Sequence, residues 1–285
     1  MITRRSFIGG LGAMACTPVQ AYFPHGNASK FIMNLVWETS ALSAPQGFRD
    51  AAVSAAKMIS NAFPLTNITF NMLVGYDDYN NGAVTGLGVN SQGGDSAALV
   101  QFVTYSNYRA AYLGVATIPN AVTFSNSLTA GTSINGHNSG YVPSGTLKAV
   151  GLLSGTNGAV DGQVGIGASI GSGNLVGVFL HEMTHAMGRE SGIFSYNLAR
   201  FTAVGTRDWS AGSPGYPTVA TYFSLDGGTT QLADFGTAQD TSDFKNSGQQ
   251  DTGGLTDALD EFYSGSSRQV MTTVDIQMMN ALGYQ

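Results

Sequence analysis

The sequence predicts an α+β protein, in which a twisted sheet and its helices come first and an irregular C-terminal lobe is closed by a helix. A strand–helix–strand pattern occupies residues 31–74, and a second helical pattern covers residues 174–187. Residues 189–267 show little periodicity before a final helical pattern. The chain of 285 residues is long enough to bury a core in one large domain, which we place at residues 22–285.

The first element is a strand over residues 31–37, where apolar residues dominate. A helix follows over residues 44–63, because Phe48, Ala52, Ala55 and Ile59 recur at helical spacing and prolines lie at both ends. Residues 68–74 alternate like a strand. A strand–helix–strand unit of this kind predicts parallel neighbouring strands joined by a right-handed crossover.

The middle of the chain mixes loops with short elements. Asp95 is a candidate cap for a helix over residues 98–103, and a second helical pattern covers residues 105–114. The other expected features are a loop at 76–94, a polar, turn-rich stretch at 119–144, and short strands at 148–153 and 163–166 around a Gly-Thr-Asn-Gly turn.

The C-terminal half contains two helices and few other regular elements. The helix over residues 174–187 should end at Gly188, a residue that favours helix C-termini. A strand is expected at 220–225, before the turn formed by residues 226–228. The last helix should start at Thr272, which forms a capping-box pattern with Asp275. Its buried face should contain Ile276, Met279 and Leu282.

The composition and the N-terminus predict an exported protein. Only 11% of the residues are charged, and the net charge of −6 argues against a nucleic-acid partner, which needs a basic surface. Residues 1–21 resemble a twin-arginine export signal, with Arg4 and Arg5 before a short apolar stretch, so we expect a periplasmic or extracellular location. No later stretch is apolar for long enough to span a membrane. Cys16, the only cysteine, lies in this signal, where lipidation is an alternative to cleavage after Ala21.

The segment His181-Glu182-Met183-Thr184-His185 is an H-E-x-x-H motif on the predicted helix. Residues four apart share one helix face, so both imidazoles can bind one metal ion, and zinc suits this ligand type. Glu182 is adjacent to the first ligand, where it can act as the general base on a zinc-activated water molecule. The motif therefore predicts His181 and His185 as metal ligands and Glu182 as the catalytic residue.

The sequence leaves the third protein ligand open. No histidine follows His185, and Ser191 occupies the last position of the longer signature H-E-x-x-H-x-x-G-x-x-H. The ligand should then be a carboxylate or another oxygen donor. The candidates are Glu190, Asn197, Asp208 and Asp226. Separately, the Asp- and Asn-rich residues 77–81 are a candidate calcium site, with an ordinary turn as the alternative.

Residues 178–189, VFLHEMTHAMGR, resemble the active-site segment of a family of secreted bacterial zincin-like (HExxH) metallopeptidases. The resemblance implies a zincin-like fold and a zinc site at His181 and His185. The family often has an aspartate where this chain has Asn197; if that aspartate is a ligand in the relatives, this chain would bind metal weakly or use another group. Gly205-Thr206-Arg207-Asp208 is also similar to a segment of aspartate-ligand zincins. Further similar segments lie at 43–48, 151–165, 200–205, 222–229 and 272–284.

These observations predict zinc-dependent hydrolysis of peptide bonds in a peptide or protein substrate. The sequence also allows two alternatives. One is a catalytically silent exported protein that keeps the fold and binds a partner, and the other is a zinc hydrolase of a non-peptide amide. The sequence specifies neither a cleavage site nor an oligomeric state.

Overall fold

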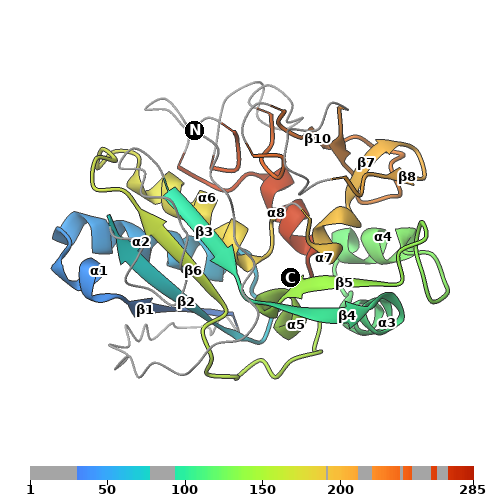
Figure 1. Cartoon of the computed structure of the whole chain (residues 1–285), viewed down its shortest axis with the longest axis horizontal. Helices are drawn as coiled ribbons and strands as arrows, with labels where there is room; N and C mark the ends of the chain where they lie inside the picture. The colour runs from blue at the N-terminus through green and yellow to red at the C-terminus, as the bar shows by residue number, and fades with distance from the viewer. Residues whose placement is uncertain are drawn as a thin grey trace.

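The computed structural model describes residues 31–77, 94–190, 192–210, 220–237, 240–245, 258–261 and 269–285. It is a mixed α/β structure, which agrees with the predicted α+β class (Figure 1). The expected export signal, Cys16, Ser191 and most of the expected loop at 76–94 lie outside the described residues. Within the described residues, no helix is long and apolar enough to cross a membrane.

The main sheet has four strands in the order β1-β2-β6-β3 (Figure 1). Strands β1 (Ile32–Trp37), β2 (Thr69–Tyr76) and β6 (Gly162–Ile166) run parallel, and β3 (Gly94–Ala98) pairs antiparallel with β6. The predicted parallel pairing of the first two strands is therefore confirmed. Strand β3 lies at one edge of this sheet, and β1 lies at the other.

Two helices cover one face of the sheet. Helix α2 (Gln46–Ala62) packs against β1, helix α6 (Leu175–Met187) packs against β6 and β3, and the two helices contact each other. The four α2 residues predicted to face the core are buried, and the ring centroid of Phe48 lies 5.0 Å from that of Phe179 in α6. A short helix, α1 (Thr39–Ser43), precedes α2.

The expected helix over residues 98–103 is wrong, because this segment forms parts of two strands. Asp95 lies inside β3, opposite Gly165, and β4 (Val100–Thr104) pairs antiparallel with β5 (Ser139–Pro143). The aromatic and β-branched side chains of β4 suit a strand once a partner strand is available. The predicted helix over residues 105–114 is confirmed as α3 (Tyr105–Val115).

Two other middle elements also differ from the prediction. The stretch expected to be turn-rich contains helix α4 (Pro119–Ser127), which begins with proline at its first position. The strand expected at 148–153 is wrong, because α5 (Ser144–Ala149) ends there in a turn. The chain turns at Gly151, which has a φ of +78°, and Lys148 in the last turn of α5 forms a buried ion pair of 2.6 Å with the Asp161 carboxylate.

The C-terminal half forms a small second sheet with the order β10-β9-β7-β8. Strand β9 (Tyr222–Phe223) is shorter than the strand expected at 220–225. The other elements are α7 (Phe194–Asn197), β7 (Arg200–Ala203), β8 (Thr206–Arg207) and β10 (Ala233–Asp234).

Helix α8 (Thr273–Ala281) closes the chain with the predicted capping box between Thr272 and Asp275. Met279 and Leu282 are buried as expected, but Ile276 is only half-buried because the buried face turns toward Val274 and Met278. Beyond α8, the Tyr284 hydroxyl donates a hydrogen bond of 2.8 Å to the Met187 carbonyl oxygen. The end of the chain therefore supports the last turn of α6.

Candidate metal centre

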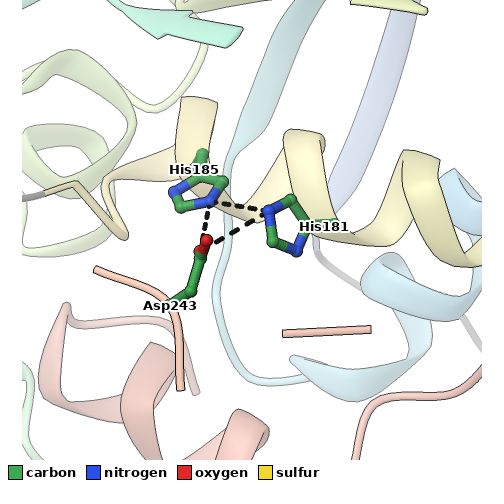
Figure 2. A group of neighbouring side chains, drawn as sticks. All are labelled: His181, His185 and Asp243. Carbon is green, nitrogen blue, oxygen red and sulfur yellow. Dashed lines mark hydrogen bonds and ion pairs between the residues drawn. The ribbon is translucent and has the colours of Figure 1, made fainter. Parts of the chain in front are cut away.

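Helix α6 places His181 and His185 one above the other on the same face (Figure 2). Their Nε2 atoms lie 3.1 Å apart, as expected for residues four apart in a helix. The His185 side chain is fully buried, whereas the His181 side chain retains 13% of its exposure. The pair is therefore anchored in the core but accessible from one side.

Asp243 completes a group of three side chains that could hold a metal ion. Its Oδ1 atom lies 2.8 Å from Nε2 of His185 and 3.5 Å from Nε2 of His181 (Figure 2). Nitrogen and oxygen atoms that bind a tetrahedral zinc ion at about 2.0–2.1 Å lie about 3.3 Å from one another. The three observed separations are close to this value, so the donor atoms fit one metal ion.

The outer nitrogen of each imidazole contacts a main-chain carbonyl oxygen. Nδ1 of His181 lies 2.7 Å from the Ala258 oxygen, and Nδ1 of His185 hydrogen-bonds to the Arg189 oxygen. A carbonyl oxygen can only accept, so each Nδ1 carries the proton. The two Nε2 atoms then present lone pairs to each other and to the Asp243 carboxylate. These three atoms are all acceptors, and a cation between them would stabilise the arrangement.

Glu182 lies between α6 and the edge strand β3, outside the group of three. Its side chain packs over the α-carbon of Gly94, the first residue of β3, and is 6% exposed. A β-carbon at Gly94 would come within 2.5 Å of the Glu182 Cγ atom. The glycine therefore allows the strand and the carboxylate side chain to approach closely.

None of the four residues proposed as the third ligand belongs to the group. Asp208 lies 3.0 Å from Nε of Arg200, and Asp226 accepts hydrogen bonds from Ser224 and Thr230 within a turn. Glu190 lies near the centre, with Oε2 4.0 Å from Nδ1 of His185, but Nδ1 is the ring nitrogen that contacts the Arg189 oxygen. Asn197 is buried in α7.

Sequence reasoning missed Asp243 because its segment has no periodicity and no fixed spacing from the helix. The available signal is Phe244, an isolated aromatic residue in a polar stretch, which indicates that the neighbouring residues are buried. At the candidate calcium site, Asp77 accepts a hydrogen bond from the Ala168 amide, and residues 78–81 lie outside the described residues.

Arg189 contacts Asp243 directly, and two other buried side chains contact Thr241 in the same segment. Nη1 of Arg189 lies 2.8 Å from Oδ1 of Asp243, and Nη1 of Arg200 donates a hydrogen bond of 2.6 Å to the Thr241 carbonyl oxygen. The Tyr196 hydroxyl donates to the same oxygen at 3.3 Å, and burial raises the pKa of Tyr196 so far that it remains a neutral donor. The ion pair with Arg189 therefore holds the Asp243 carboxylate beside α6.

No family model, curated protein or solved structure matches this chain. The geometry of the metal centre and the chemistry of its residues therefore carry the functional argument.

Proposed function

We propose that this chain is an exported zinc metallopeptidase of the zincin-like type, with His181, His185 and Asp243 as the zinc ligands. The observation that carries the proposal is the convergence of two imidazole nitrogens and one carboxylate oxygen at separations of 2.8–3.5 Å. Three protein ligands of this kind are typical of catalytic zinc sites, which keep a further position open. Glu182, next to the first ligand on the same helix, completes the set that peptide hydrolysis needs.

In this proposal, bound zinc supplies Lewis acidity that makes water a nucleophile near neutral pH. Glu182 takes a proton from the attacking water and returns it to the amine that leaves. The main-chain oxygens of Ala258 and Arg189 hold the two imidazoles in the tautomer that binds metal. Burial of His185 and Asp243 keeps bulk water from one side of the centre.

The proposed substrate is a peptide or protein segment in an extended conformation. Within the main sheet, β3 pairs with β6 on one side and forms the edge beside Glu182. An extended peptide can add to such an edge through main-chain hydrogen bonds, which places its backbone next to the proposed base. The twin-arginine-like residues 1–21 support export, so the substrate would lie outside the cytoplasm.

The test compares Glu182→Gln with Glu38→Gln, a substitution at an equally buried glutamate that hydrogen-bonds to Gln163. Wild-type protein should bind about one zinc per chain and hydrolyse a casein-type substrate. Glu182→Gln should keep its zinc and lose about 10²–10⁴ in rate, because a positioned general base contributes that much. Glu38→Gln should keep its activity, and His185→Ala should lose metal and activity together.

The outcomes separate the proposal from its alternatives. Proteolysis that persists in Glu182→Gln contradicts the mechanism, and absence of metal in the wild type contradicts the zinc site. If the wild-type protein holds zinc but hydrolyses neither peptides nor other amides, the result favours the alternative of a catalytically silent binding protein. If a screen of other amides gives turnover that Glu182→Gln abolishes, the result favours a non-peptide hydrolase.

A further inference from the structure

The turn that ends helix α6 contains one residue, Arg189, that contacts all three metal-binding residues through its side chain or its main chain. Gly188 has a φ of +125°, its amide bonds to the His185 oxygen at 2.8 Å, and the Arg189 amide bonds to the Thr184 oxygen at 3.0 Å. This hydrogen-bond pattern is a Schellman motif, which turns the chain back along the helix. Arg189 is therefore placed beside the helix turn that carries both histidines.

Arg189 is 1% exposed, and each of its guanidinium nitrogens has a partner. Nη1 lies 2.8 Å from Oδ1 of Asp243 and donates to the Ser242 carbonyl oxygen at 2.9 Å. On the helix side, Nε donates to Oγ1 of Thr184 at 3.2 Å and Nη2 donates to the His181 carbonyl oxygen at 3.3 Å. The main-chain oxygen of Arg189 also accepts from Nδ1 of His185.

We propose that Arg189 is the positioning residue of this metal centre, an inference that rests on the metal site of the proposed function. Its guanidinium group fixes Asp243 at the correct distance from the helix, and its main-chain oxygen fixes the tautomer of His185. The arginine donates to the same Oδ1 atom that faces both histidines. It therefore orients that oxygen before a metal ion arrives, and the ion pair offsets the cost of burying the carboxylate.

The planar fork of arginine is essential to this role. Lysine carries the same charge but a single nitrogen, so it cannot reach Asp243, Ser242, Thr184 and His181 at the same time. A purely structural ion pair would need only the charge. The difference between arginine and lysine at this position therefore separates positioning of a ligand from charge compensation.

Arg200 provides a matched control. It is 0% exposed and donates to Thr241, two residues before Asp243, and its Nε pairs with Asp208. In the described contacts, Arg200 touches the segment that carries the ligand but none of the three metal-binding side chains. Arg200→Lys should therefore reproduce the stability cost of changing a buried arginine without the effect on the ligands.

The experiment measures Zn²⁺ affinity by competition with a chelator, the visible spectrum of the Co²⁺-loaded protein, and the melting temperature of the metal-free protein. Arg189→Lys should weaken Zn²⁺ binding about 10- to 100-fold, which is typical of residues that orient metal ligands, and should change the Co²⁺ spectrum. Arg200→Lys should leave the affinity within about threefold and the spectrum unchanged, even if its melting temperature falls equally. Thr184→Val removes the Nε contact of Arg189 and the hydrogen bond from Oγ1 of Thr184 to the His181 carbonyl oxygen. It should weaken Zn²⁺ binding by a smaller factor, and it is measured instead if Arg189→Lys does not fold.

Unchanged affinity and spectrum in Arg189→Lys would overturn the inference, as would equal losses of affinity in both arginine variants. If Thr184→Val is the variant measured, unchanged affinity overturns it as well. These readouts do not depend on hydrolysis, so wild-type protein that binds metal but cleaves no peptide refutes only the proposed activity. A wild-type protein that binds neither Zn²⁺ nor Co²⁺ refutes both.

Discussion

Replacing Gly188 with alanine should damage both the stability of the protein and its metal centre. A φ of +125° costs a residue with a side chain about 1–2 kcal/mol. The new β-carbon would also lie 2.8 Å from Oγ1 of Thr146 and 3.0 Å from Cγ of Pro143, and such crowding adds about 1–3 kcal/mol. For a chain of this size, the two costs together should lower the melting temperature by about 5–15 °C.

Gly151→Ala separates the backbone effect from the damage to the metal centre. Gly151 follows the end of α5 with a φ of +78°, and a β-carbon there would meet no atom within 4 Å. This variant should lose only about 1–2 kcal/mol and keep the wild-type affinity for Zn²⁺. Gly188→Ala should bind Zn²⁺ at least about tenfold more weakly, because Arg189 can no longer reach its partners. Thermal melts and chelator competition measure both effects. Equal metal affinity in the two variants would refute the reasoning.

Three other substitutions test separate parts of the structure. Gly94→Ala should push Glu182 aside and lower kcat by about 10²-fold, while the zinc content stays at one per chain. Kinetics equal to those of the wild type would contradict the packing of Glu182 against β3. Asp208→Ala should lower the melting temperature, because it removes the carboxylate that pairs with the buried Arg200, but it should not change the zinc content. Loss of zinc in this variant would show that Asp208 is a metal ligand after all. Lys148→Met should cost about 3–5 kcal/mol in a thermal or urea melt, because it strips Asp161 of its buried partner. Burial already raises the pKa of Asp161, and loss of the lysine would raise it further. The stability difference between Lys148→Met and the wild type should therefore shrink as the pH falls and Asp161 is protonated. A difference that grows at low pH would show that Asp161 is not the group responsible.

Local signals in the sequence predicted the elements whose residues interact with near neighbours. Gly188 ends α6 because the Schellman motif needs a residue that tolerates positive φ. Thr272 and Asp275 start α8 because each side chain accepts from the main chain of the other. The apolar residues of α2 bury one face at a spacing that only a helix provides.

The elements that the sequence did not predict depend on distant partners. Residues 98–103 have a mixed pattern, and their conformation is decided by pairing with β6 and with β5. Residues 148–153 contain a short apolar run that suits a strand or a helix equally well, and in the folded protein Lys148 pairs with Asp161 at the end of α5. Such contacts join segments that are far apart in the sequence, so no local pattern predicts them.

The metal centre likewise has one part that the local sequence predicts and one part that depends on distant contacts. The two histidines are four residues apart, so helix geometry alone brings them together. Asp243 is held beside them by an ion pair with Arg189, a residue from the turn that follows α6. No spacing rule connects these residues, and the third member of the group is therefore visible only in the folded protein.

The distance along the chain between His185 and Asp243 gives a bound ion a second role as a cross-link. With a single cysteine, this chain cannot form an internal disulfide. An ion held by both residues would close a loop of almost sixty residues, and in chain-entropy terms a covalent bridge across such a loop contributes about 4 kcal/mol. Removal of the ion would remove this cross-link and leave the segment around Asp243 held only by weaker contacts such as its ion pair with Arg189. Proteolysis of the metal-free protein should then begin in the part of the chain that follows the helix.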